Sequence, residues 1–73
     1  PSTNIQYTIP KSGYVRLAVF NLLGQEVARI FEGTQSAGTY EVTFDKEGLP
    51  TGIYFYRIQA PGFVETRKMI VTK

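Results

Sequence analysis

The stretch GLPTGIYFYRI, residues 48–58, decides the fold. It places three consecutive aromatic residues directly behind a loop of Gly, Leu, Pro, Thr and Gly. Leu49 can fill a core from the loop, Pro50 stiffens the bend and Gly52 permits a sharp entry into the next strand. A tyrosine at this point returns its hydroxyl to the loop backbone in immunoglobulin-type sandwiches, because a buried hydroxyl needs a partner. The stretch therefore predicts a corner closed by Tyr54.

Alternation along the same stretch predicts which side chains form the core. Tyr54, Tyr56 and Ile58 would face inward, whereas Phe55 and Arg57 would face outward. An outward phenylalanine has two interpretations: its ring lies under neighbouring basic side chains, which is the simpler one, or it belongs to a docking patch for another domain.

The strand period continues through most of the chain. Apolar and polar residues alternate in six runs, at residues 5–9, 15–19, 27–31, 40–44, 53–60 and 64–72. Pro10 ends the first run, since proline cannot donate to a strand ladder. Turn signals separate the runs, and no segment has a helical stripe. The pattern predicts an all-β fold, an immunoglobulin-like antiparallel β-sandwich of six to seven strands, which occupies residues 1–73 as one domain.

Two connections can be predicted in more detail. Residues 21–24, Asn-Leu-Leu-Gly, suit a type I turn in which Gly24 takes a positive φ as a G1 bulge. Residues 32–38 are polar and predict an exposed connection.

The last hairpin gives a conflicting signal. If Pro61 and Gly62 form a two-residue loop, Tyr54 pairs with Met69 on the inner face, but Ile58 then pairs with a glutamate. We therefore expect a bulge or a wider loop that includes Phe63. Met69 and Val71 are predicted to face the core.

Composition excludes several classes of function. The 73 residues contain no cysteine and no histidine, so thiol chemistry, disulfides and the usual general base are absent. The net charge of +2 is too weak a field to indicate a nucleic-acid partner. No apolar run approaches the length of a membrane span, so no membrane insertion is predicted.

The remaining polar residues give no convincing site. Asp45 and Glu47 lie two apart in a loop, where a solvated turn explains them better than calcium or a carboxylate pair for catalysis. No catalytic residue, metal or cofactor is predicted, and the chain is not expected to be an enzyme. Two weaker candidate sites are a sugar-stacking platform of Tyr7, Tyr14 and Tyr40, and a positive cluster of Arg57, Arg67, Lys68 and Lys73. The simpler interpretation of the cluster is protection of a sheet edge, and the other is an acidic partner.

Nearly the whole chain resembles a known family. The matching stretches, in order, are PSTNIQYTIP, VRLAVFNLLGQEV, SAGTYEVTFD, GLPTGIYFYRI and GFVETRKMIVTK. Together they resemble the type A C-terminal sorting domain of the type IX secretion system, and also the overlapping immunoglobulin-like domain of the flagellar hook-capping protein. Asn21, Gly24, Gly52 and Tyr54 match signature positions of the family that we interpret as fold residues. Family members usually carry Asn-Pro-Phe-Asn ahead of PST, so we expect a piece of a larger parent protein whose domains precede Pro1.

The resemblance implies a non-catalytic secretion signal. Such domains end exported proteins of Gram-negative bacteria, which pass from the periplasm through the outer membrane to the cell surface or the medium. The implied partners are the translocon and a sortase-like peptidase. Translocon recognition is attributed in the family to the C-terminal end, which here is Lys68, Met69, Ile70, Val71, Thr72 and Lys73. The alternatives are a passive immunoglobulin-like accessory module, or a carbohydrate- or adhesion-binding module, of a surface enzyme.

Overall fold

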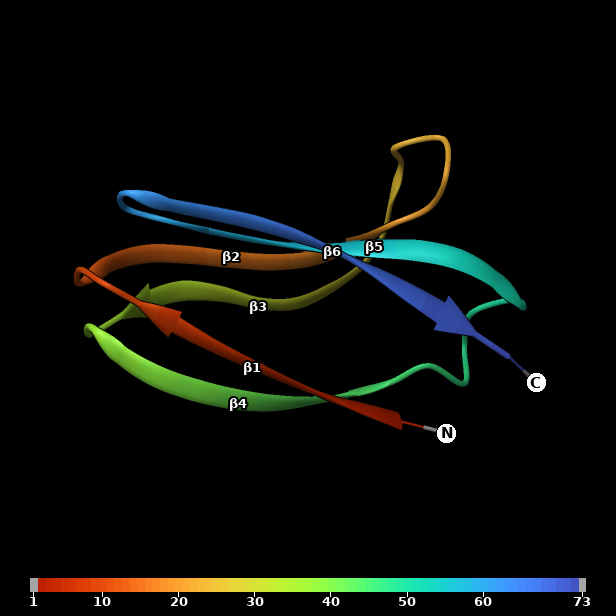
Figure 1. Cartoon of the computed structure of the whole chain (residues 1–73), viewed down its shortest axis with the longest axis horizontal. Coiled ribbons are helices and arrows are strands. Elements are labelled where there is room, and N and C mark those ends of the chain that lie inside the picture. Colours follow the sequence, from red (N-terminus) through yellow and green to blue (C-terminus); the bar gives the residue numbers. More distant parts are fainter. Residues whose placement is uncertain (1, 73) are drawn as a thin grey trace.

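Two antiparallel sheets make up the computed structural model, which describes residues 2–72 (Figure 1). The strands are β1 (Ser2–Ile9), β2 (Gly13–Phe20), β3 (Glu26–Gln35), β4 (Gly38–Asp45), β5 (Gly52–Ala60) and β6 (Phe63–Val71). One sheet pairs β1 with β4, and the other has the order β3-β2-β5-β6. The all-β prediction is confirmed, and the arrangement is compatible with an immunoglobulin-like sandwich. Residues 2–72 include no helix with the length and hydrophobicity needed to cross a membrane.

The core follows the period-two pattern of the sequence. Ile5, Tyr7 and Ile9 of β1 are buried, and Leu17 of β2 lies opposite them in the same cluster with Ile58 of β5. A second cluster lies nearer the end of β6 and contains Val19, Leu49, Tyr54, Met69 and Val71. The inward prediction for Met69 and Val71 is thereby confirmed. Burial of these side chains is the main stabilising term of so small a sandwich.

One polar contact ties the two sheets together. The Tyr7 hydroxyl, on the two-stranded sheet, donates to Gln35 Oε1 at the end of β3, with 2.9 Å between the oxygens. Burial raises the pKa of Tyr7, because the neutral phenol suits this interior better than the phenolate. The Tyr7 ring also stacks on Tyr40 of β4, with centroids 5.6 Å apart.

The corner predicted from residues 48–58 is present. The Tyr54 hydroxyl donates to the carbonyl oxygen of Pro50 across 2.7 Å, and the Tyr54 side chain is 7% exposed. Leu49 fills the core from the loop at 8% exposure. Earlier in the same loop, the Glu47 amide donates to the Asp45 carboxylate at 2.9 Å, so Asp45 closes a turn as expected.

The turn between β2 and β3 also has its predicted geometry. Gly24 has a φ of +83°, and its amide donates to the Asn21 carbonyl at 3.0 Å. The Asn21 side chain completes the loop, because its Oδ1 accepts from the amides of Leu23 and Gln25 at 2.9 and 3.0 Å. The Asn21 amide in turn donates to the Gln25 carbonyl at 3.0 Å.

Two local predictions are wrong. Residues 32–38 are not a long connection, because β3 continues to Gln35 and pairs with β2 as far as Gly13. The last hairpin has neither a bulge nor a wider loop: Ala60 pairs with Phe63, and Ile58 pairs with Glu65. The pairing is tolerated because β6 is an edge strand, so the carboxylate of Glu65 reaches the rim of the sandwich instead of the core.

Candidate recognition surface on the terminal strand

One edge of β6 has no strand partner among residues 2–72. β6 pairs with β5 along its whole length and ends the four-stranded sheet. Its other edge therefore presents backbone N–H and C=O groups that a further strand could pair with.

Alternation divides the predicted recognition segment into two sets. Met69 and Val71 point into the core and are 7% and 1% exposed. Lys68, Ile70 and Thr72 are exposed, and Ile70 keeps 57% of its surface in solvent. Lys73 lies outside the described residues. Among residues 68–72, the exposed set and the free backbone edge are the parts open to a partner in the folded domain.

The exposed set continues onto a partly apolar outer face. The register places Phe20, Phe55 and Lys68 in one row across β2, β5 and β6, and Ile70 pairs with Ile53 in the next row. Of the two basic residues near Phe55, Lys68 pairs with it in register, whereas Arg57 lies over the ring of Phe20. The guanidinium carbon of Arg57 lies 4.6 Å from the centroid of the Phe20 ring.

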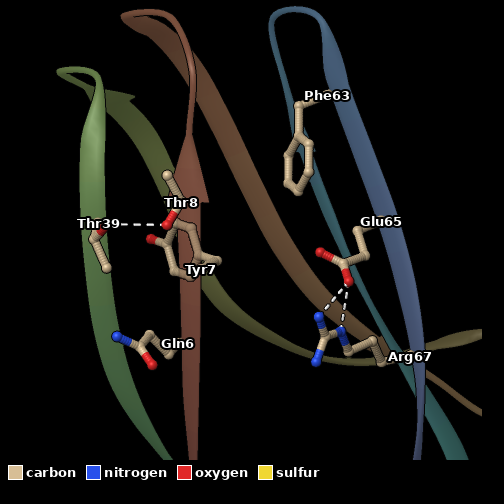
Figure 2. Close-up of a pocket in the computed structure, with 7 residues that line it drawn as sticks. All are labelled: Gln6, Tyr7, Thr8, Thr39, Phe63, Glu65 and Arg67. Carbon is tan, nitrogen blue, oxygen red and sulfur yellow. Dashed lines mark hydrogen bonds and ion pairs between the residues drawn. The ribbon is translucent and has the colours of Figure 1, made fainter.

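The first half of β6 borders a hollow of about 450 Å³ between the two sheets. Figure 2 shows Phe63, Glu65 and Arg67 projecting from β6 toward the two-stranded sheet. The opposite wall is formed by β1 and β4 and consists of Gln6, Tyr7, Thr8 and Thr39. The hydroxyls of Thr8 and Thr39 are joined at 2.9 Å. None of the exposed recognition residues lines this hollow, so it is a separate feature of the same strand.

The predicted positive cluster is divided between two faces of the sheet. Arg57 and Lys68 lie on the outer face, whereas Arg67 pairs with Tyr56 in register and so lies on the inner face. Arg67 Nε and Nη2 donate to Glu65 Oε2 at 2.6 and 2.5 Å, and this pairing raises the pKa of Arg67. Because Glu65 offsets the charge of Arg67, the positive charge of the cluster is smaller than the sequence indicates. Lys73 is again outside the described residues.

The other candidate sites gain no support. The tyrosine platform is wrong, because Tyr7 is 3% exposed inside the sandwich and Tyr14 is 56% exposed on the outer face of the other sheet. Residues 2–72 contain no group of three potential metal-ligating side chains. Asn21 and Gly24 lie in the β2–β3 turn, and Gly52 and Tyr54 lie at the corner, where they pair with β6 on the edge that faces β5 and not on its free edge.

Sequence reasoning missed the polar hollow and the exposed tip of the β2–β3 turn. Gln6, Thr8 and Thr39 read as ordinary outward positions of strands, and only the placement of β1 beside β6 makes them part of a hollow. Residues 21–24 are predicted to form a turn, and side chains at the tip of a turn are usually exposed. That prediction could have identified Leu22 and Leu23 as exposed apolar residues.

The comparisons with known proteins agree with this geometry. The family model described as secretion system C-terminal sorting domain matches residues 1–72. No curated protein and no solved structure gives a match to this chain. The resemblance to the flagellar hook-capping domain stays a prediction. The sandwich, the corner and the edge strand are consistent with this match. Because the family model spans nearly all of the sequence, the chain belongs to the family of C-terminal sorting domains of type IX secretion.

Proposed function

We propose that this chain is a non-catalytic sorting signal, which directs a parent protein N-terminal to it from the periplasm through the outer membrane by type IX secretion. The proposal rests on the family match over residues 1–72. In this role the parent reaches the cell surface or the medium, the translocon binds the domain, and a sortase-like peptidase removes it. The domain itself catalyses no reaction.

The structural observation that carries the proposal is the division of β6. Met69 and Val71 anchor the strand in the core, while Lys68, Ile70 and Thr72 face solvent beside an unpaired backbone edge. A translocon receptor that adds a strand to this edge would gain main-chain hydrogen bonds whatever the side chains, and the exposed side chains would add selectivity.

Point variants test this better than truncation. Deletion of residues 68–73 would also remove Met69 and Val71 from the core, so a loss of export would not separate recognition from unfolding. The test fuses the domain to a periplasmic reporter in a bacterium with a type IX system and compares the double variant Lys68→Glu and Ile70→Ser with wild type. The matched control is Val64→Ser, which changes a residue 64% exposed on the same face of β6 but outside the segment.

We expect the wild-type fusion and the Val64→Ser control to be found outside the cell. The double variant should remain in the periplasm, although its thermal unfolding is unchanged. A wild-type fusion that stays in the periplasm would refute the sorting function and leave the accessory module and the carbohydrate- or adhesion-binding module as the alternatives. Export of the double variant at the wild-type level would refute recognition through Lys68 and Ile70.

A further inference from the structure

Two adjacent leucines at the tip of the β2–β3 turn are the most exposed large apolar side chains of residues 2–72. Leu22 is 66% exposed and Leu23 is 83% exposed. Single exposed leucines are common on protein surfaces, but this neighbouring pair belongs to neither core cluster. The turn that carries the pair stands out from the sheets (Figure 1). The fold alone does not explain why this turn carries leucines and not the polar residues typical of a hairpin tip.

The tip is held rigid by its own hydrogen bonds. Asn21 Oδ1 accepts from the amides of Leu23 and Gln25, and Asn21 Nδ2 donates to Gln25 Oε1 at 3.0 Å. The backbone adds Gly24 N to Asn21 O and Asn21 N to Gln25 O, each at 3.0 Å. A loop ordered before binding loses little conformational entropy when it is bound, so the two leucines are presented as a preformed knob.

The register places the base of this turn at the same end of the four-stranded sheet as the end of β6, with β5 between β2 and β6. The turn follows Phe20 directly, and Phe20 lies in one row with Phe55 and Lys68. Ile53 and Ile70 form the next row toward the end of β6 and are 39% and 57% exposed. The turn and the end of β6 therefore lie at the same end of the sheet, where exposed apolar side chains lie among the cations Arg57 and Lys68.

We propose that Leu22 and Leu23 insert into an apolar pocket of the same translocon protein that contacts Lys68 and Ile70, so that one receptor reads the tip and the terminal strand together. This inference rests on the proposed function. A protein pocket fits better than a lipid surface, because residues 21–26 contain one acid, Glu26, and no base, and the neighbouring cation Arg57 lies over the Phe20 ring and not at the tip.

The test uses the same reporter fusion with the double variant Leu22→Ser and Leu23→Ser. The Asn21 side chain accepts from the backbone amides of Leu23 and Gln25 and from no leucine side chain, so the fold should be retained, which thermal unfolding checks. We expect the exported fraction to fall by roughly tenfold or more, since two apolar side chains would lose their burial in the complex. Val64→Ser, with a comparable exposed apolar side chain at the opposite end of β6, should be exported as wild type.

Photocrosslinking identifies the occupant. A benzoyl-phenylalanine placed at Leu23 and, in a second fusion, at Ile70 should crosslink to the same outer-membrane polypeptide. The inference would be overturned by crosslinks to two different polypeptides. It would also be overturned if the double leucine variant were exported as well as the wild-type fusion. Either result would leave the sorting function intact. Leucine-dependent cosedimentation of the domain with phosphatidylglycerol–phosphatidylcholine vesicles would overturn the protein pocket in favour of a membrane. Failure of the wild-type fusion to be exported would refute both proposals.

Discussion

Replacing Tyr54 by Phe tests the corner on which the sandwich depends. The change removes one hydroxyl and leaves the ring, so packing against Leu49 and Met69 is retained. What is lost is the 2.7 Å hydrogen bond to the carbonyl of Pro50. A typical intramolecular hydrogen bond contributes about 1 kcal/mol. Pro50 is exposed, so its carbonyl can turn to water and the full penalty for a buried unpaired group does not apply.

We therefore expect Tyr54→Phe to lower the free energy of unfolding by about 1 kcal/mol. For a domain of this size, that corresponds to a fall in Tm of about 4–8 °C, measured by circular dichroism, with a parallel fall in the urea midpoint. The shift should not depend on protein concentration, since the lost bond lies within one chain.

A matched control lies elsewhere in the same chain. The Tyr40 hydroxyl donates to the Ser36 carbonyl at 2.5 Å, which is also four residues upstream, but this bond is exposed. Tyr40→Phe keeps the ring that stacks on Tyr7 and should cost less than about 0.5 kcal/mol. If Tyr54→Phe shifts Tm no more than Tyr40→Phe does, the corner bond is not a stabilising feature and the reasoning is refuted.

Three further changes have defined outcomes. Val71→Ala removes part of a side chain that is 1% exposed and should cost about 2 kcal/mol in urea titration; a cost near zero would contradict its place in the core. Gly24→Ala forces a side chain onto a φ of +83° and should cost about 1 kcal/mol, whereas Gly48→Ala, with nothing within 4 Å of the added carbon, should be nearly neutral. The hydrogen bond from Arg16 lowers the pKa of Glu26 below its ordinary value of 4.5. The ionised Glu26 therefore stabilises the fold above pH 4.5, and this contribution is lost as the pH falls through the lowered pKa of the folded protein. The Tm difference between wild type and Glu26→Gln should therefore shrink on acidification below pH 4.5, and a constant difference would argue against the ion pair.

The fold could be predicted well because both of its determinants are local. Period-two alternation identifies strands that bury one face, as the buried Ile5, Tyr7 and Ile9 show. The residues that follow Gly48 specify the corner by their own backbone preferences. The end of β3 was harder, since Glu32 and Thr34 lie on an edge strand where polar side chains are tolerated and resemble a loop.

The candidate site was less accessible to sequence reasoning, because it depends on which strands are neighbours in space. Glu65 opposite Ile58 looks like an error of register until β6 is known to be an edge and Arg67 is found at 2.5–2.6 Å from the carboxylate. Alternation did predict that Met69 and Val71 are buried, but the family resemblance treats residues 68–73 as one unit. Only the structure separates that unit into buried and exposed members.

The order of the strands along the chain has a consequence for quality control. β6 is the last of the strands to leave the ribosome, and the second core cluster needs Met69 and Val71 from it. A polypeptide broken off before these residues lacks part of its interior and cannot complete the sandwich. In the proposed sorting role, an exporter that admits only completed sandwiches would thereby reject prematurely terminated cargo, with no separate proofreading device.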